Sequence, residues 1–298
     1  MTAPRIGIAL GSGAARGWAH IGVLRALAAA GIELAVVCGS SIGAVVGAAC
    51  AAGRLAEIEA FARGLTWRSV LGQLDLRPAG GGLFAGERVS RTLIDLIGHQ
   101  AMQTLGMRYG AVATELGTGR EIWLREGDLA VAIRASMALP GVLAPVEVEG
   151  QWLVDGGLVN PVPVSLCRAL GAELVLGVNL NGGIAGRRRA LPAPLIGRDA
   201  DGDGNGRRSG RAGKLLASLL PVGSPAPGYF DVMVGAVNIM QDQITRTRLA
   251  GDPPDILVQP RLGHIGVLEF NRADEAINAG EAAMRALLPA LQGLIGEA

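Results

Sequence analysis

Apolar positions along this chain follow two patterns, short uninterrupted runs and longer stretches with a period near 3.6 residues. The uninterrupted runs predict buried strands, and they lie at 6–10, 34–37, 109–114, 121–124, 173–179 and 255–259. The longer stretches predict helices, at 21–28, 44–52, 57–65, 90–97, 129–137, 162–170 and 230–249. Alternation of strands and helices of these lengths is typical of an α/β fold with a mainly parallel, helix-covered sheet.

Two segments depart from this alternation. Residues 146–149 and 151–154, joined at Gly150, predict a hairpin. Between 183 and 228 the pattern breaks, and Gly, Pro and Arg dominate. We interpret this stretch as a mobile, solvated insertion in a single domain spanning residues 1–298.

The insertion admits a second interpretation. Residues 181–214 hold eight Lys or Arg against three Asp, an excess of five positive charges, and the apolar segment 215–220 follows. Basic residues next to apolar ones are typical of peripheral contact with anionic membrane. Liposome binding by a variant lacking 183–228 distinguishes the two interpretations, because a solvated insertion predicts unchanged binding.

Composition narrows the functional class. Half of the residues are hydrophobic, enough for a large core, and the net charge of +1 offers no overall attraction to nucleic acid. Three cysteines without metal-like spacing indicate reduced thiols in a cytoplasmic protein.

No secretory signal is predicted, since a strand pattern begins at residue 6. The uncharged window 34–53 is long enough to span a bilayer, but its central Gly-Ser-Ser turn favours a buried strand and helix.

A G-x-S-x-G box, Gly39-Ser40-Ser41-Ile42-Gly43, lies between a predicted strand and a predicted helix. Such a box places its central serine at the apex of a sharp, strained turn, at the positive end of the helix dipole. Ser41 is therefore a candidate nucleophile, and the structural alternative is an ordinary Gly/Ser turn.

Two further segments supply what a nucleophile needs. The Gly-rich turn at residues 11–17 follows the first strand, where backbone N–H groups can bind an oxyanion. Asp155 ends the strand 151–154 and offers a carboxylate base. A triad of Ser41, Asp155 and His264 has the chain order of the α/β-hydrolases, although that fold normally has several strands before its nucleophile. A dyad in which Asp155 takes the serine proton directly needs no histidine.

Taken together, these motifs resemble those of the patatin-like phospholipases. The resemblance rests on Gly-Ser-Gly-Ala-Ala-Arg-Gly at 11–17, Gly-Ser-Ser-Ile-Gly at 39–43 and Asp-Gly-Gly-Leu-Val-Asn-Pro-Val-Pro at 155–163. The segment 132–141 is similar to the bacterial branch related to neuropathy target esterase. The resemblance covers about residues 5–180.

The resemblance implies a three-layer α/β/α fold and hydrolysis of a lipid acyl ester by a Ser–Asp dyad, with no cofactor and no metal. By motif match, Ser41 is the nucleophile, Asp155 the proton acceptor, and the amides of Gly13 and Ala14, with Ala15 as a further candidate, form the oxyanion hole. The remaining motif residues are Ser12, Arg16, Gly17, Gly39, Gly43, Gly156 and Gly157.

One departure from the family pattern concerns the oxyanion turn. The first and third glycines of the G-x-G-x-x-G frame are Ser12 and Ala14 here. The backbone N–H groups survive this change provided the turn needs no positive φ at residue 14. The departure favours, as an alternative function, a binding or regulatory protein on a patatin scaffold with weak esterase activity.

The sequence gives less support to two other kinds of ligand site, a dinucleotide site and a calcium site. A Rossmann-type dinucleotide site is opposed by the spacing of Gly11, Gly13 and Gly17, which does not match G-x-G-x-x-G. Residues 199–205 resemble the start of a calcium loop, but Gly210 stands where the twelfth-position carboxylate is required. No oligomeric state is predicted.

Overall fold

The computed structural model describes residues 4–66, 68–69, 82–84, 86–182 and 229–297. Within them, an eight-stranded sheet has the order β10-β9-β1-β2-β4-β8-β7, with β5 also paired to β4. Its strands are β1 (Ile6–Leu10), β2 (Val36–Ser40), β4 (Arg108–Glu115), β5 (Glu121–Leu124), β7 (Val146–Val148), β8 (Gln151–Asp155), β9 (Leu174–Val178) and β10 (Ile256–Val258). A separate parallel pair joins β3 (Gly82–Phe84) to β6 (Gly141–Leu143).

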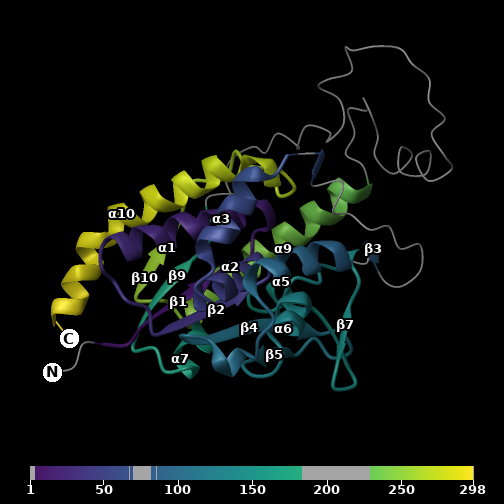
Figure 1. The fold of residues 1–298 in the computed structure, drawn as a ribbon, viewed down its shortest axis with the longest axis horizontal. Coiled ribbons are helices and arrows are strands. Elements are labelled where there is room, and N and C mark those ends of the chain that lie inside the picture. Colours follow the sequence, from purple (N-terminus) through teal and green to yellow (C-terminus); the bar gives the residue numbers. More distant parts are fainter. Residues whose placement is uncertain (1–3, 67, 70–81, 85, 183–228, 298) are drawn as a thin grey trace, which may run out of the picture.

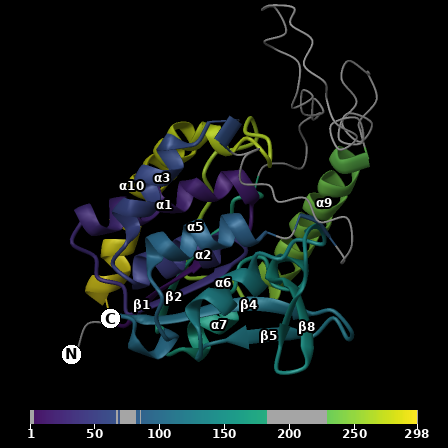
Figure 2. The ribbon, with the colours of Figure 1, turned by 45° about the vertical axis from the view of Figure 1, so that its right-hand side comes forward.

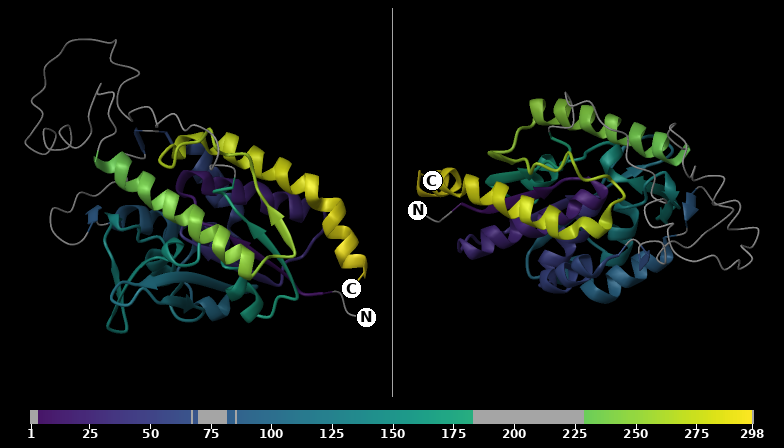
Figure 3. Two further views of the ribbon diagram at one scale, coloured as in Figure 1. Left: turned by 180° about the vertical axis from the view of Figure 1, so that it is seen from behind. Right: turned by 90° about the horizontal axis from the view of Figure 1, so that it is seen from above.

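Helices cover both faces of the large sheet (Figures 1 and 2). They are α1 (Ala19–Ala29), α2 (Ile42–Ala51), α3 (Leu55–Gly64), α5 (Glu87–Ile97), α6 (Leu129–Ser136), α7 (Val164–Ala169), α9 (Tyr229–Gly251) and α10 (Ala273–Glu297). Short 3₁₀ turns lie at η1 (Ala14–Trp18), η2 (Met102–Thr104), η3 (Gly156–Leu158) and η4 (Phe270–Arg272). In Figure 3, α9 and α10 cross the molecule as two long, separate helices.

The three layers follow from the alternation of side chains along each strand. Ile8 and Leu10 of β1 and Val37 of β2 point into the main core, beneath helices that include α1, α2 and α10. Ala9 and Cys38, one position away on the same strands, point into a second core with α7. Successive residues of a strand face opposite sides, so a fully apolar strand needs helices on both faces.

The predicted α/β/α fold with a mainly parallel sheet is confirmed. β1, β2, β4, β9 and β10 pair in parallel, while β5, β7 and β8 run antiparallel to their neighbours. The β3–β6 pair was not predicted, because three-residue strands leave no measurable periodicity. The predicted insertion at 183–228, with the calcium-like segment 199–205, lies outside the described residues.

The uncharged window 34–53 forms β2 and α2, as predicted. The strand begins at Val36, two residues later than expected, and continues to Ser40. The following helix is ten residues long and almost entirely buried. Across the described ranges, no helix combines the length and hydropathy needed to cross a membrane.

Candidate active site

Strand register brings the three sequence motifs to one place. β1 and β2 are parallel neighbours with Leu10 opposite Gly39, so the Gly-rich turn and the serine box leave the sheet at the same edge. On the other side of β2, Ser40 is opposite Val112 of β4. The next residue of β4, Ala113, is opposite Asp155 of β8. Asp155 therefore ends its strand directly beside the serine turn.

Ser41 stands at the turn between β2 and α2 with strained backbone angles, φ 57° and ψ −124°. Its amide donates to the Ser136 hydroxyl at 3.0 Å. The turn is tight because a Cβ on Gly39 would lie 2.3 Å from the carbonyl carbon of Gly43. A Cβ on Gly43 would lie 2.1 Å from the carbonyl oxygen of Leu10. Both glycines of the box are therefore required by space.

Asp155 is buried and accepts two hydrogen bonds. The Ser41 hydroxyl donates to Oδ2 at 2.5 Å, and the Gly157 amide donates to Oδ1 at 2.7 Å. Burial raises the pKa of Asp155 to about 6, although the hydrogen bonds from Ser41 and Gly157 act in the opposite direction. The carboxylate is thus more basic than an exposed aspartate, yet mostly ionised near neutral pH.

The Gly-rich turn offers two amides to the site. Gly13 and Ala14 line the same pocket as Ser41, and within the described part of the chain neither amide N–H has a hydrogen-bond acceptor. The amide of Ala15 differs, since it donates to the Val267 carbonyl at 3.0 Å. This engagement removes Ala15 from the candidate oxyanion donors, because its N–H already has a partner inside the fold.

Ala14 has a φ of 50°, in the left-handed region that favours glycine. The turn therefore does need a positive φ at residue 14, where this chain has alanine in place of the family's glycine. Its amide remains in place, but the alanine carries backbone strain that a glycine would avoid.

Other motif residues support the turns. Arg16 is buried and donates from Nε to the Ile265 carbonyl at 2.9 Å, which holds the segment before Val267 beside the Gly-rich turn. Gly17 leaves room for Ile42, which would lie 2.2 Å from a Cβ there. Gly156 similarly allows close approach to the Val112 carbonyl oxygen, which would lie 2.1 Å from a Cβ at that position.

The three histidines lie elsewhere. His264 is half exposed, with its Nε2 3.4 Å from Glu275 on α10. His20 is buried, with its Nε2 2.7 Å from the Gly11 carbonyl oxygen. His99 lies on the surface beside Asp95. None of them lines the pocket of Ser41, so the geometry brings a carboxylate to this serine and leaves His264 outside.

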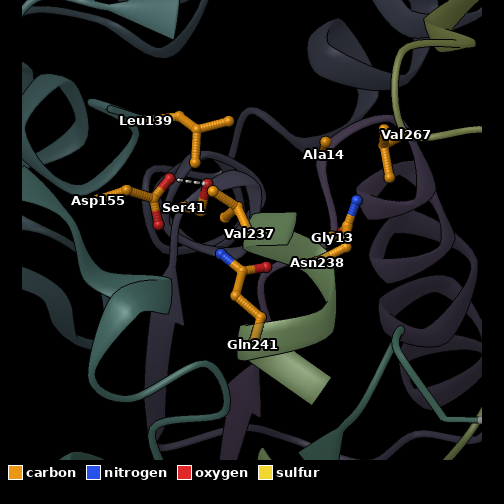
Figure 4. A pocket seen from close by; sticks show the side chains of 9 residues that line it. All are labelled: Gly13, Ala14, Ser41, Leu139, Asp155, Val237, Asn238, Gln241 and Val267. Carbon is orange, nitrogen blue, oxygen red and sulfur yellow. Dashed lines mark hydrogen bonds between the residues drawn. The ribbon is translucent and has the colours of Figure 1, made fainter. Parts of the chain in front are cut away.

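The site opens into a small pocket (Figure 4). Its lining residues are Gly13, Ala14, Ser41, Leu139, Asp155, Val237, Asn238, Gln241 and Val267. Three of them come from α9, and sequence reasoning gave that helix no functional role. Helical periodicity shows that one face of a helix is buried but not what it packs against. Leu139, together with Ser136, lies inside the segment 132–141 that carried part of the family resemblance.

Comparison with known proteins identifies the family. The family model described as patatin-like phospholipase matches residues 8–168. An uncharacterised NTE family protein of Mycobacterium tuberculosis is 36% identical, over 98% of this chain and 93% of that protein. The chain belongs to the patatin-like phospholipase family. Membership supports a lipid-ester hydrolase at the family level and leaves the dinucleotide interpretation without support.

This patatin-like protein also shows weaker similarity to two further proteins. Lysophospholipase NTE1 of Pyricularia oryzae is 27% identical, over 92% of this chain but 18% of its own length. The crystal structure of VipD from Legionella pneumophila aligns with a TM-score of 0.49 at 11% identity, covering 97% of this chain and 67% of VipD.

Proposed function

We propose that this protein hydrolyses acyl-ester bonds of phospholipids or lysophospholipids, with Ser41 as nucleophile and Asp155 as its base. The hydrogen bond from Ser41 Oγ to Asp155 Oδ2 carries the proposal, since it joins a serine on a strained turn to a buried carboxylate. Family membership supports the lipid-ester class, and the name of the Pyricularia relative adds lysophospholipids as candidates.

In the acylation step, Ser41 Oγ attacks the ester carbonyl carbon while its proton passes to Asp155. The carbonyl oxygen becomes an oxyanion, which the amides of Gly13 and Ala14 stabilise. When the tetrahedral intermediate collapses, the bond to the alcohol oxygen breaks and Asp155 returns the proton to that oxygen. The products are a free alcohol and an acyl group on Ser41.

In the deacylation step, water attacks the acyl-enzyme and gives its proton to Asp155, which then passes it to Ser41 Oγ as the fatty acid leaves. An ordinary aspartate is a weak base for this task. The raised pKa of Asp155, caused by burial, brings its basicity closer to that of a histidine.

The test is hydrolysis of short- and long-chain acyl esters by the wild type and three variants. Ser41→Ala removes the nucleophile, so kcat should fall by about 1,000-fold or more. Asp155→Asn keeps the shape but removes the base, with an expected loss of about 100- to 10,000-fold. His264→Ala should retain activity, because His264 is paired with Glu275 outside the pocket.

A matched control is Ser40→Ala, which removes the neighbouring hydroxyl. Ser40 is buried and its Oγ has no hydrogen-bond partner in the described structure, so the loss of this oxygen should leave activity intact. Activity that survives Ser41→Ala would rule out the proposed nucleophile. Loss with His264→Ala would favour a triad over the dyad.

A binding or regulatory protein with weak esterase activity is the second candidate. It is favoured by the strained Ala14 in the oxyanion turn and by α9, which lines the pocket with three side chains. This candidate predicts that Ser41→Ala binds lysophospholipid micelles as tightly as wild type while wild-type turnover stays near background.

A cytoplasmic location, with peripheral contact to anionic membrane through 183–228, remains part of the proposal.

A further inference from the structure

Helix α9 contributes Gln241 to the pocket, and this side chain is hydrogen-bonded to the motif residue Ser12. Gln241 is 5% exposed and lines the pocket together with Ser41 and Asp155. The hydroxyl of Ser12, itself 1% exposed, donates to Gln241 Oε1 at 3.2 Å. Ser12 stands where the family frame has a glycine, so the side chain that holds Gln241 is a feature of this chain.

The bond to Ser12 and the nearby Asp155 carboxylate together favour one orientation of the carboxamide. With Oε1 turned to Ser12, the Nε2 amino group faces the opposite side, where Figure 4 shows it directed toward the Asp155 side of the pocket. Within the described residues, Nε2 has no hydrogen-bond acceptor. The two N–H groups of this nearly buried side chain therefore lie at the pocket, where an oxygen of a bound ligand can accept from them.

Gly157 makes the space for this amino group. A Cβ on Gly157 would lie 2.4 Å from Gln241 Nε2 and 3.0 Å from Asp155 Oδ1. The Gln241 amino group and the Asp155 carboxylate thus both lie next to the position that a side chain at residue 157 would occupy. Placing N–H groups next to a carboxylate is also the electrostatically favourable orientation of the amide.

The chemistry of the reaction says which part of a substrate lies there. Asp155 must return its proton to the leaving alcohol oxygen, so the alcohol portion of the ester lies on the Asp155 side, and the oxyanion lies toward Gly13 and Ala14. We propose that Gln241, oriented by Ser12, binds an oxygen on the alcohol portion and so favours glycerol esters over simple alkyl esters. This inference rests on the proposed hydrolase function.

The test compares two esters of one fatty acid, a 1-monoacylglycerol and the matching ethyl ester, by kcat/KM. Gln241→Leu keeps the side-chain volume but removes the donors. The ratio of the monoacylglycerol value to the ethyl ester value should fall about threefold to tenfold, as expected for one hydrogen bond. Gln243→Leu removes the same amide from the exposed face of α9 and should leave the ratio at its wild-type value.

Ser12→Ala provides a second, independent variant that removes only the orienting hydroxyl. It should lower the same ratio by a smaller factor, because the amide is then free to turn. In the double variant Ser12→Ala/Gln241→Leu the ratio should equal that of Gln241→Leu alone, since the two residues act through one contact.

Three outcomes would overturn the inference. In the first, Gln241→Leu lowers kcat/KM equally for both esters. In the second, the ratio is unchanged although thermal unfolding shows a folded variant. In the third, the effects of Ser12→Ala and Gln241→Leu are additive. Absence of turnover of both esters by the wild type would contradict the hydrolase function itself, and this result is distinguishable from all three.

Discussion

At the scale of single residues, backbone strain is concentrated at the pocket. Among the described residues, Ala14, Ser41 and Glu149 are the non-glycine residues with positive φ. The first two line the pocket, and the third lies in the exposed turn between β7 and β8. Strained conformations persist where the surrounding structure enforces them, and they cluster at functional sites. Ser41 and Ala14 fit this pattern from two different motifs.

The ionisation of Asp155 predicts the pH dependence of activity. In the proposed mechanism its carboxylate must be deprotonated to accept the Ser41 proton, and burial raises its pKa to about 6. Activity should therefore rise with pH, by about tenfold in kcat/KM between pH 5 and pH 7. A pH–rate profile with a nonionic ester measures this. A flat profile over that range would show that Asp155 titrates near the value of an exposed aspartate.

Ala14→Gly should stabilise the protein. A left-handed alanine costs about 1–2 kcal/mol, and the larger entropy of an unfolded glycine offsets part of this gain. The expected net increase in the free energy of unfolding is about 0.5–1 kcal/mol, measured by urea denaturation.

Glu149→Gly is the matched control for this strain. Its φ is also 50°, but it is exposed in the turn between β7 and β8 and does not line the pocket. It should give a similar gain in the free energy of unfolding. If Glu149→Gly stabilises the protein and Ala14→Gly destabilises it, the methyl group of Ala14 contributes packing that outweighs its strain.

At the scale of helices and strands, two glycines hold α1 and α10 in direct contact. A Cβ on Gly22 would lie 1.9 Å from the Ile277 carbonyl oxygen, and a Cβ on Gly280 would lie 1.9 Å from the Ala19 carbonyl oxygen. Each helix thus presents a glycine to the backbone of the other. This contact fixes α10 over α1, the helix that follows the Gly-rich turn and η1.

Gly280→Ala should destabilise the protein by about 2 kcal/mol or more, because the methyl group can be accommodated only if the two helices separate. The matched control is Gly293→Ala on the same helix, where no atom lies within 4 Å of the position that a Cβ would take. It should stabilise by about 0.5–1 kcal/mol, as alanine is the better helix former. Thermal and urea unfolding of the pair measure the difference. Equal effects of the two substitutions would contradict close packing of α1 on α10.

The sequence predicted most strands of the large sheet because parallel strands buried on both faces are apolar at every position. The run at 6–10 matches β1 residue for residue. Predictions were less accurate for elements whose formation or position depends on tertiary contacts. β3 and β6 are three residues each and pair with one another across a long stretch of chain. The position of α9 over the pocket likewise follows from packing between segments far apart in the chain.

At the scale of the whole molecule, two buried groups act on stability in opposite directions as pH changes. Burial lowers the pKa of His20 to about 4, below its unfolded value of 6.5. The unfolded chain then binds more protons between these values, so His20 reduces stability as pH falls through this window. Asp155, with its pKa raised from 3.8 to about 6, increases stability as pH falls from about 6.

His20→Gln should flatten the loss of stability in acid. Its neutral side chain can still donate to the Gly11 carbonyl, which His20 contacts at 2.7 Å. The wild type should lose up to about 3 kcal/mol through His20 by pH 4, and the variant should not. Urea unfolding at several pH values between 4 and 7 measures this. An identical pH dependence in the two proteins would show that His20 does not titrate in this range.

The sequence by itself determined the family and the α/β pattern, and it located the three motifs that hold Ser41, Asp155 and the Gly-rich turn, because each motif depends on local backbone geometry. Only the tertiary structure decided which groups meet. It placed Asp155 rather than His264 at Ser41, engaged the Ala15 amide with Val267, and brought Gln241 to Ser12. These contacts join segments up to 252 positions apart in the chain, and strand register and helix packing set them.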